Sequence, residues 1–241
     1  MGPPQVMDSP RRPGRQDGFN MAYKTALHDD SAADAPGQFI LSNLPDVRMS
    51  DDDEKGKGGS GPLEALKKTR TIELFGPVNG ALAKRVISQL LYLESEDPEK
   101  PITVLQNSPG GSVTDGFAIY DCMRFVKPEI RIVCLGITAS IATMTLLGAK
   151  KENRFTLPHT EFLIHQPLIA GSVYGVASDL EITARHILKT RELINHMLSR
   201  ETGQPLDVVQ RHTERDYWMT AKEAVEYGLV ARMIESRHEI E

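Results

Sequence analysis

Strand-like and helix-like patterns of apolar residues alternate along the chain from Thr71 onward. Thr71–Phe75 has the composition of a strand and stops at Gly76-Pro77. The residues that follow have an apolar side chain at helical spacing, and Asn79 is placed to cap that helix. The apolar positions of this helix are Leu82, Val86, Leu90, Leu91 and Leu93. The pattern predicts one β-turn-α unit.

The same unit recurs further along the chain. Residues 101–106 predict a second strand, 107–111 a turn and 112–126 a helix. Residues 129–135 predict a third strand, 136–139 a turn and 140–150 a helix of small and apolar residues. A β-rich stretch follows at 154–157 and 161–164. This alternation is typical of a layered α/β domain, in which active sites lie at the carboxyl ends of the strands.

A long helix is predicted at residues 177–202, ending at Gly203. Its apolar residues occupy overlapping faces. Together they give the helix more apolar surface than packing against one side of a small domain requires. These residues are Leu180, Ile187, Leu188, Leu193, Ile194, Met197 and Leu198. We expect a packing arm for oligomerisation. A core helix of the same domain is the alternative that the pattern leaves open.

The first 68 residues have a different composition. They are rich in Pro, Gly, Ser and Asp and show little periodicity, so a disordered amino-terminal extension is expected at 1–68. The ordered domain is then expected at 69–235, with a short tail at 236–241. A second methionine, Met21, leaves open a start of translation there.

Charge and cysteine content narrow the classes of partner. The chain has 28 basic and 33 acidic side chains in 241 residues, a net charge of −5, which argues against nucleic acid as a partner. Its two cysteines, Cys122 and Cys134, lack the spacing of a metal site and are too few for a disulfide framework. No apolar run reaches the roughly 20 residues that cross a bilayer, and no secretory signal is evident. We therefore expect a cytoplasmic protein with no membrane partner.

Residues 107–111 form a glycine-bearing turn, Asn-Ser-Pro-Gly-Gly, between a strand and a helix. Glycine allows the backbone to approach a ligand closely, so exposed N–H groups here could bind an anion or a developing oxyanion. The ending of a phosphate-binding P-loop is absent. An ordinary tight turn is the alternative.

Three side chains are candidates for nucleophilic catalysis. Ser140 lies at the start of a predicted helix among small residues, where it could be a nucleophile or a helix cap. His165 lies at the end of a predicted strand and could act as its general base. Asp216 precedes apolar residues and could orient His165, or it could be a surface or capping aspartate.

The order of these motifs resembles the Clp protease proteolytic subunit. The resemblance covers about residues 71–234. It is carried by NSPGGS at 107–112, TAS at 138–140, LIHQPL at 163–168 and TERD at 213–216. Similar stretches also occur at 89–100, 202–206 and 221–229. Several independent motifs in one order make coincidence implausible.

The resemblance implies a serine endopeptidase with a crotonase-like fold of repeated β-turn-α units. Ser140 would be the nucleophile, His165 the general base and then acid, and Asp216 the group that orients the imidazole. The N–H groups of Gly111 and Ile141 would form the oxyanion hole. No cofactor or metal is implied for this chain.

The family further implies an assembly of two stacked heptameric rings that encloses the active sites, with the helix at 177–202 as the stacking arm. Unfolded polypeptides would be threaded in by a Clp-family AAA+ unfoldase, which would use the ATP. The ring could be built from this chain alone or mixed with a paralogous subunit.

The chain departs from the family pattern in three places. Ile141-Ala142-Thr143 stands where the family usually has Met-Gly-Ala, the segment between His165 and the long helix is two residues longer, and the amino end has no clear match before Thr71. A weakly active or inactive structural subunit of a mixed Clp ring is therefore kept as one alternative. An acyl-CoA enzyme of crotonase type is the other, since that fold also uses glycine turns to bind an enolate oxygen.

Overall fold

The computed structural model describes Gly2, residues 62–169 and residues 174–240. The chain divides into two units, 1–58 and 59–241, and the second contains all the elements described below. Met21 and most of the extension expected to be disordered lie outside the described residues; only Gly2 and residues 62–68 of that extension are described. There, α2 (Pro62–Lys68) is a helix, with Glu64 in its first turn and Lys67 and Lys68 in its last. This charge arrangement suits the helix dipole.

A seven-stranded sheet forms the centre of the domain, with β1-β2-β3-β4-β7 as its main order. β5 branches from β3 and pairs with β6. Every pairing is parallel except that of β5 with β6. The strands are β1 (Thr71–Phe75), β2 (Ile102–Ser108), β3 (Ile130–Ala139), β4 (Arg154–Thr156), β5 (Glu161–Ile164), β6 (Tyr217–Thr220) and β7 (Arg232–Met233). The predicted α/β class is confirmed.

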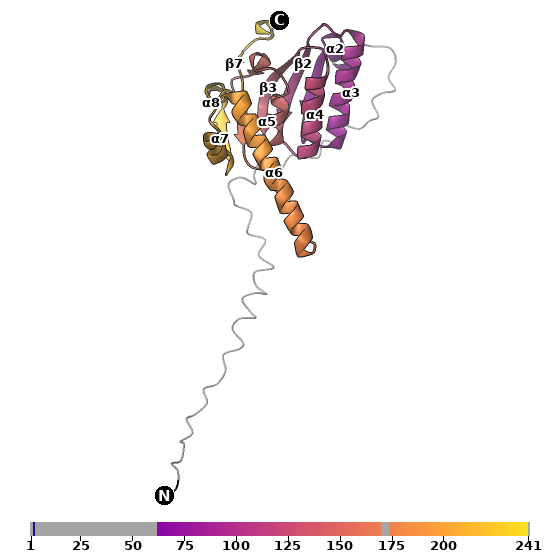
Figure 1. The fold of residues 1–241 in the computed structure, drawn as a ribbon. Helices are drawn as coiled ribbons and strands as arrows, with labels where there is room; N and C mark the ends of the chain where they lie inside the picture. Colours follow the sequence, from indigo (N-terminus) through magenta and orange to yellow (C-terminus); the bar gives the residue numbers. More distant parts are fainter. Residues whose placement is uncertain (1, 3–61, 170–173, 241) are drawn as a thin grey trace, which may run out of the picture. The chain divides into compact units, whose positions relative to one another are not determined.

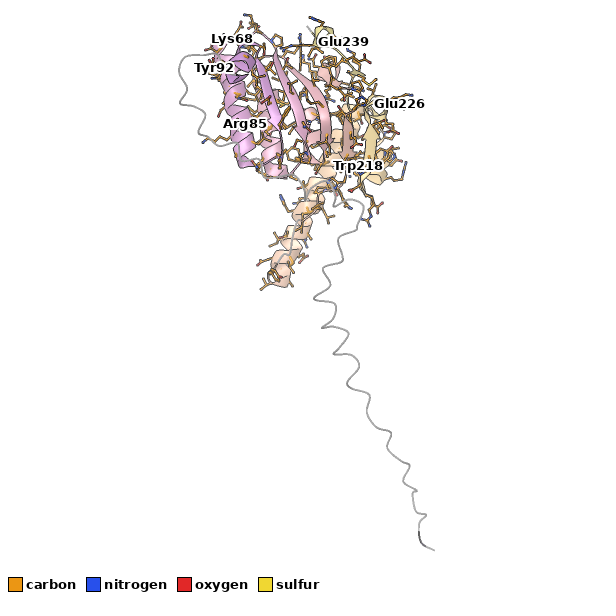
Figure 2. All side chains as sticks on the ribbon, turned by 180° about the vertical axis from the view of Figure 1, so that it is seen from behind. Lys68, Arg85, Tyr92, Trp218, Glu226 and Glu239 are labelled. Carbon is orange, nitrogen blue, oxygen red and sulfur yellow. The ribbon has the colours of Figure 1, made fainter. Side chains whose placement is uncertain are left out.

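Helices α3 (Gly80–Glu96), α4 (Val113–Phe125) and α5 (Ile141–Leu146) lie against one face of the sheet (Figure 1). From behind, the strands are nearest the viewer, and Trp218 lies at the opposite side from Arg85 and Tyr92 (Figure 2). α3 begins as predicted: the N–H of Leu82 donates to Oδ1 of Asn79 at 2.9 Å. The helical faces and the sheet bury one continuous apolar core, which holds the carboxyl ends of the strands rigidly in place.

The turn predicted at 136–139 is wrong, because β3 continues through it. β3 pairs with β4 over Ile132–Cys134 and then with β5 over Ile137–Ala139. Gly136, at φ +67°, lies at the change of partner, where a Cβ would be 2.8 Å from Oδ1 of Asn107. That oxygen accepts the N–H of Ile137 at 3.1 Å. A side chain thus completes the ladder where glycine bends the strand.

The helix predicted at 140–150 is shorter, since α5 ends at Leu146 and the 3₁₀ turn η2 (Lys151–Asn153) follows the bend after it. The bend is stabilised by Arg154, whose side chain is fully buried. Its guanidinium donates to the carbonyls of Ala149 at 2.9 Å and Leu147 at 3.4 Å. Carbonyls directed at a buried cation favour the turn over a further helical turn.

α6 (Ala177–Thr202) matches the predicted long helix, including its left-handed end at Gly203. It protrudes from the rest of the domain (Figure 1). Its buried residues all lie at its carboxyl-terminal end, from Ile194 to Thr202, whereas Ile182 is 67% exposed. One end of α6 is therefore part of the core, and the other presents apolar side chains on the surface.

A buried ion pair fastens the inner end of α6 to β4. Nη2 of Arg154 is 2.5 Å from Oε2 of Glu201. Burial by itself raises the pKa of Glu201, but hydrogen bonds and charge from Arg154 and Arg200 outweigh it, and the pKa lies below its ordinary value. Burial lowers the pKa of Arg154, which Glu201 opposes. The pair is therefore charged at neutral pH.

Two short helices complete the domain. α7 (Leu206–Thr213) precedes β6 and α8 (Ala221–Tyr227) follows it. α8 starts with a reciprocal capping box between Thr220 and Glu223 and ends at Gly228 in the left-handed conformation. The chain finishes with η3 (Arg237–Glu239) inside the segment expected as a tail.

Candidate active site

Ser140 joins β3 to α5 in a strained conformation. Its φ is +57°, uncommon for a residue with a side chain, and strain of this kind often occurs at functional sites. Its N–H donates to the carbonyl of Leu163 at 2.9 Å, and its carbonyl accepts the hydroxyl of Thr143 at 2.6 Å. Its own hydroxyl makes no capping hydrogen bond to the helix. The capping alternative is therefore wrong, and the hydroxyl is available for another contact.

That contact is with His165. Nε2 of His165 lies 2.8 Å from Oγ of Ser140. The parallel pairing of β3 with β5 aligns Ala139 with Leu163, which brings the ends of both strands together. The imidazole is largely shielded, with 15% of the side chain exposed. A serine hydroxyl at this distance from an imidazole can transfer its proton to the ring.

Asp216 lies on the other side of the imidazole. β5 and β6 pair antiparallel, with Ile164 opposite Tyr217, and the next position along this register places His165 opposite Asp216. Oδ1 of Asp216 is 3.3 Å from Nδ1 of His165. The Asp216 side chain is 60% exposed. All three side chains singled out in the sequence are thus connected in one line.

The glycine turn approaches the serine directly. At Gly110, with φ +93°, a Cβ would be 2.6 Å from Cβ of Ser140 and 2.7 Å from the carbonyl oxygen of Ala139. Val78 forms an isolated parallel bridge with Gly111, through the carbonyl of Gly110 and the N–H of Ser112. In a parallel bridge the N–H of the paired residue points the other way, so that of Gly111 faces away from Val78.

An apolar hollow lies beside Ser140 and His165. Its lining includes Val113, Ile141, Met144, Ile164, Pro167, Ile194 and Leu198 together with Thr143. Ile141 is packed tightly on Gly116 of α4, where a Cβ would collide with the isoleucine side chain. Such a lining suits an uncharged, apolar group next to the hydroxyl.

A second hollow, on the solvent side, is lined by His165, Gln166, Pro167, Leu168 and residues 214–216. Here the backbone N–H of Gln166 donates to the carbonyl of Thr213 at 2.6 Å. The side-chain amide of Gln166 donates to the carbonyl of Glu214 at 2.8 Å. These contacts of Gln166 were not predicted from the sequence. The approach of Gly110 to Ser140 and the hydrogen bond of Leu163 with Ser140 were not predicted either. The only signal for Gln166 was its position next to His165.

Within the described ranges, no cluster of three or more His, Cys, Asp or Glu side chains could hold a metal ion. None of the described helices is long and apolar enough to span a membrane. Cys134 is fully buried, and its burial raises the pKa of the thiol to about 12. The thiol is therefore protonated at neutral pH and acts as a small core residue.

A family model described as Clp protease matches residues 55–237. This stretch includes every strand of the sheet and all three residues of the line from Ser140 to Asp216. The chain belongs to the Clp protease family. The domain is accordingly a Clp-type peptidase domain, and the resemblance seen in the sequence motifs is confirmed.

Proposed function

We propose that the chain is a serine endopeptidase that cuts unfolded polypeptides. The observation that carries this proposal is the contact of 2.8 Å between Oγ of Ser140 and Nε2 of His165. His165 takes the proton of the hydroxyl while Oγ attacks the peptide carbonyl carbon, and then returns the proton to the leaving amine. Water then attacks the acyl carbon and gives a proton to His165, which returns it to Oγ of Ser140 as the ester bond breaks and the carboxylic acid leaves. Asp216 orients the imidazole and stabilises its charged form.

The oxyanion of the tetrahedral intermediate is stabilised by the N–H groups of Gly111 and Ile141 in this proposal. Ile141 directly follows Ser140, and its N lies 3.2 Å from the position that a Cβ on Gly110 would take. The glycine turn and the start of α5 therefore lie side by side at the serine. Preorganised donors of this kind stabilise negative charge that develops on a carbonyl oxygen.

The proposed substrate is an extended peptide with an apolar side chain in the hollow beside Ser140. The hollow is small and lined mainly by aliphatic side chains, so it would accept one apolar side chain of an extended segment. Unfolded chains supply both the extended backbone and the apolar side chain. In the family this supply is the role of a Clp-family AAA+ unfoldase, which we propose as the partner here, and which would use the ATP.

The proposed assembly is two stacked heptameric rings, made by this chain alone or together with a paralogue. Four apolar residues on α6 are exposed although the helix is well formed: Leu180, Ile182, Leu188 and Leu193. Several large apolar side chains exposed along one helix favour contact with another subunit. The contact between Ser140 and His165 favours an active subunit over an inactive one. An acyl-CoA enzyme would have no use for an activated serine.

Reaction with a fluorescent fluorophosphonate tests the chemistry. The wild-type chain should gain one label and hydrolyse a short peptide that carries leucine before a coumarin amide. Ser140→Ala should do neither, whereas Ser95→Ala, which changes an exposed serine on α3, should behave as the wild type. Peptide hydrolysis that persists in Ser140→Ala would refute the proposal. CoA binding without labelling would favour the acyl-CoA alternative.

Mass measurement of the intact assembly tests the oligomer. Fourteen copies are expected, and Ile182→Asp on the exposed part of α6 should halve the assembly to single rings. Glu181→Gln, at the neighbouring position, is the matched control and should keep the full mass. Degradation of an unfolded protein that needs an added Clp-family ATPase and ATP would support the proposed partner, and degradation at the same rate without them would contradict it.

A further inference from the structure

The turn that carries Asp216 needs support from outside the β5–β6 ladder. The ladder ends at Ile164 and Tyr217, one position before His165 and Asp216. The Asp216 carboxylate is 60% exposed and 3.3 Å from the imidazole, so water competes for it. Its contact with His165 is too weak by itself to keep the turn in place.

Gln166 supplies that support. Apart from the contact of Asp216 with His165, two hydrogen bonds among the described residues join the end of β5 to this turn or to the last residue of α7 before it. Both start from Gln166. Its backbone N–H reaches Thr213, and its amide Nε2 reaches the carbonyl of Glu214, two residues before Asp216. The first bond persists whatever the side chain, and the second depends on the amide.

The surroundings of the amide determine its orientation. Nη1 of Arg191 on α6 lies 3.5 Å from Oε1 of Gln166, and arginine can only donate. The carbonyl of Glu214 can only accept, so the Nε2 group must face it. A residue with an acceptor at both positions would repel the carbonyl of the turn.

We propose that Gln166 is a positioning residue of the peptidase site, which keeps Asp216 within reach of His165 by clamping the turn at residues 214–216. The proposal rests on the proposed serine peptidase function. Gln166 is not among the residues that line the apolar hollow at Ser140. Its amide donates instead to the carbonyl of Glu214 in the turn that carries Asp216, so its role in this proposal is exerted through Asp216.

Steady-state hydrolysis of the coumarin peptide by the assembled full-length protein gives the first test. Gln166→Met keeps the length of the side chain and removes both polar ends; kcat should fall about ten- to a hundredfold, with KM within about twofold. Gln166→Glu keeps the acceptor for Arg191 and loses the donor to the carbonyl of Glu214. Its kcat should fall at least as far as that of Gln166→Met. Gln210→Met, an exposed glutamine of α7, is the matched control and should have wild-type kcat and KM.

A double-mutant cycle with Asp216→Ala separates positioning from a general structural effect. If Gln166 acts through Asp216, adding Gln166→Met to Asp216→Ala should lower kcat by less than about twofold. The residual rate is followed over hours, with the Ser140→Ala protein as the blank. An equal fall in both backgrounds would overturn the proposal, as would wild-type kcat in both Gln166→Met and Gln166→Glu.

The same variants distinguish a failure of the positioning role from a failure of the peptidase function on which it rests. Activity that persists in Ser140→Ala refutes the peptidase chemistry. An inactive Ser140→Ala together with fully active Gln166 variants refutes only the positioning role. Assembly mass and melting temperature are measured for each variant; if Gln166→Met does not assemble, the cycle is run with Gln166→Glu, which keeps the shape and the contact with Arg191.

Discussion

The serine end and the carboxylate end of the line from Ser140 to Asp216 are built differently. Ser140 lies between Ala139 and Ile141, each 2% exposed, and its backbone is bonded to β5 and to Thr143. Asp216 lies in a surface turn with an exposed carboxylate. The core therefore determines the position of the Ser140 hydroxyl, whereas a few polar contacts determine the position of the Asp216 carboxylate. Small changes near Asp216 should alter activity without altering stability, and changes near Ser140 should alter both.

The largest effect is expected from Asp216→Asn. The amide cannot stabilise the charged imidazole, so kcat should fall about 10⁴-fold. Because the side chain is exposed, the free energy of unfolding should change by less than about 0.5 kcal/mol. Peptide hydrolysis and urea unfolding of the same preparation measure both. Asp207→Asn, at an exposed aspartate of α7 paired with Arg211, should leave kcat unchanged.

The opposite outcome is expected for Glu201→Gln, at the buried ion pair that fastens α6 to β4. This change leaves the buried Arg154 without its counter-charge and should lower the free energy of unfolding by about 3 kcal/mol. The folded fraction should keep its kcat. Glu181→Gln, in an exposed pair with Arg185, should cost less than about 0.5 kcal/mol. Equal costs for the two variants would contradict a special role for the buried pair.

The same pair predicts a pH dependence. The pKa of Glu201 in the folded protein lies below its ordinary value of 4.5. The stabilisation by this carboxylate is therefore fully present above pH 4.5 and is lost as the pH falls through the lower folded value. Urea unfolding at pH 7 and at pH 4, at one protein concentration, should show a larger loss for the wild type than for Glu201→Gln.

A glycine pair tests how closely the turn fits the serine. Gly110→Ala places a methyl group against Ser140, whereas Gly76→Ala, at a similar φ of +84°, meets nothing within 4 Å. Both carry the backbone strain of a positive φ, about 1 kcal/mol. Only Gly110→Ala should also lower kcat, by about tenfold or more. Comparable kcat values for the two variants would show that the turn can yield.

The smallest effect is expected for Arg191→Met. Its contact with Gln166 is long, at 3.5 Å, so it contributes little to holding the turn. The kcat for the coumarin peptide should fall less than about threefold, with KM unchanged. A fall as large as that of Gln166→Met would mean that α6, and not the amide alone, holds the carboxylate end.

Local patterns predicted most of the elements. The strand at Thr71–Phe75, the cap at Asn79 and the long helix that ends at Gly203 are all confirmed, because each depends on residues that are close in sequence. The error at Gly136 has the same origin: glycine between apolar residues usually marks a turn, and here Asn107 from another strand completes the ladder instead. The helix at Pro62–Lys68 lay in a segment whose composition pointed to disorder.

The sequence by itself determined the α/β class, the family and the candidates Ser140, His165 and Asp216, through motifs that occur in one order. It left Ser140 as a cap or a nucleophile and α6 as a core helix or an arm. The tertiary structure excludes side-chain capping by Ser140, whose hydroxyl contacts His165, and it shows that α6 is core at one end and exposed at the other. Strand register also decided that Asp216 faces His165 and that Gln166 reaches the turn. Register arises when segments distant in the chain pack together cooperatively, so no local pattern contains it.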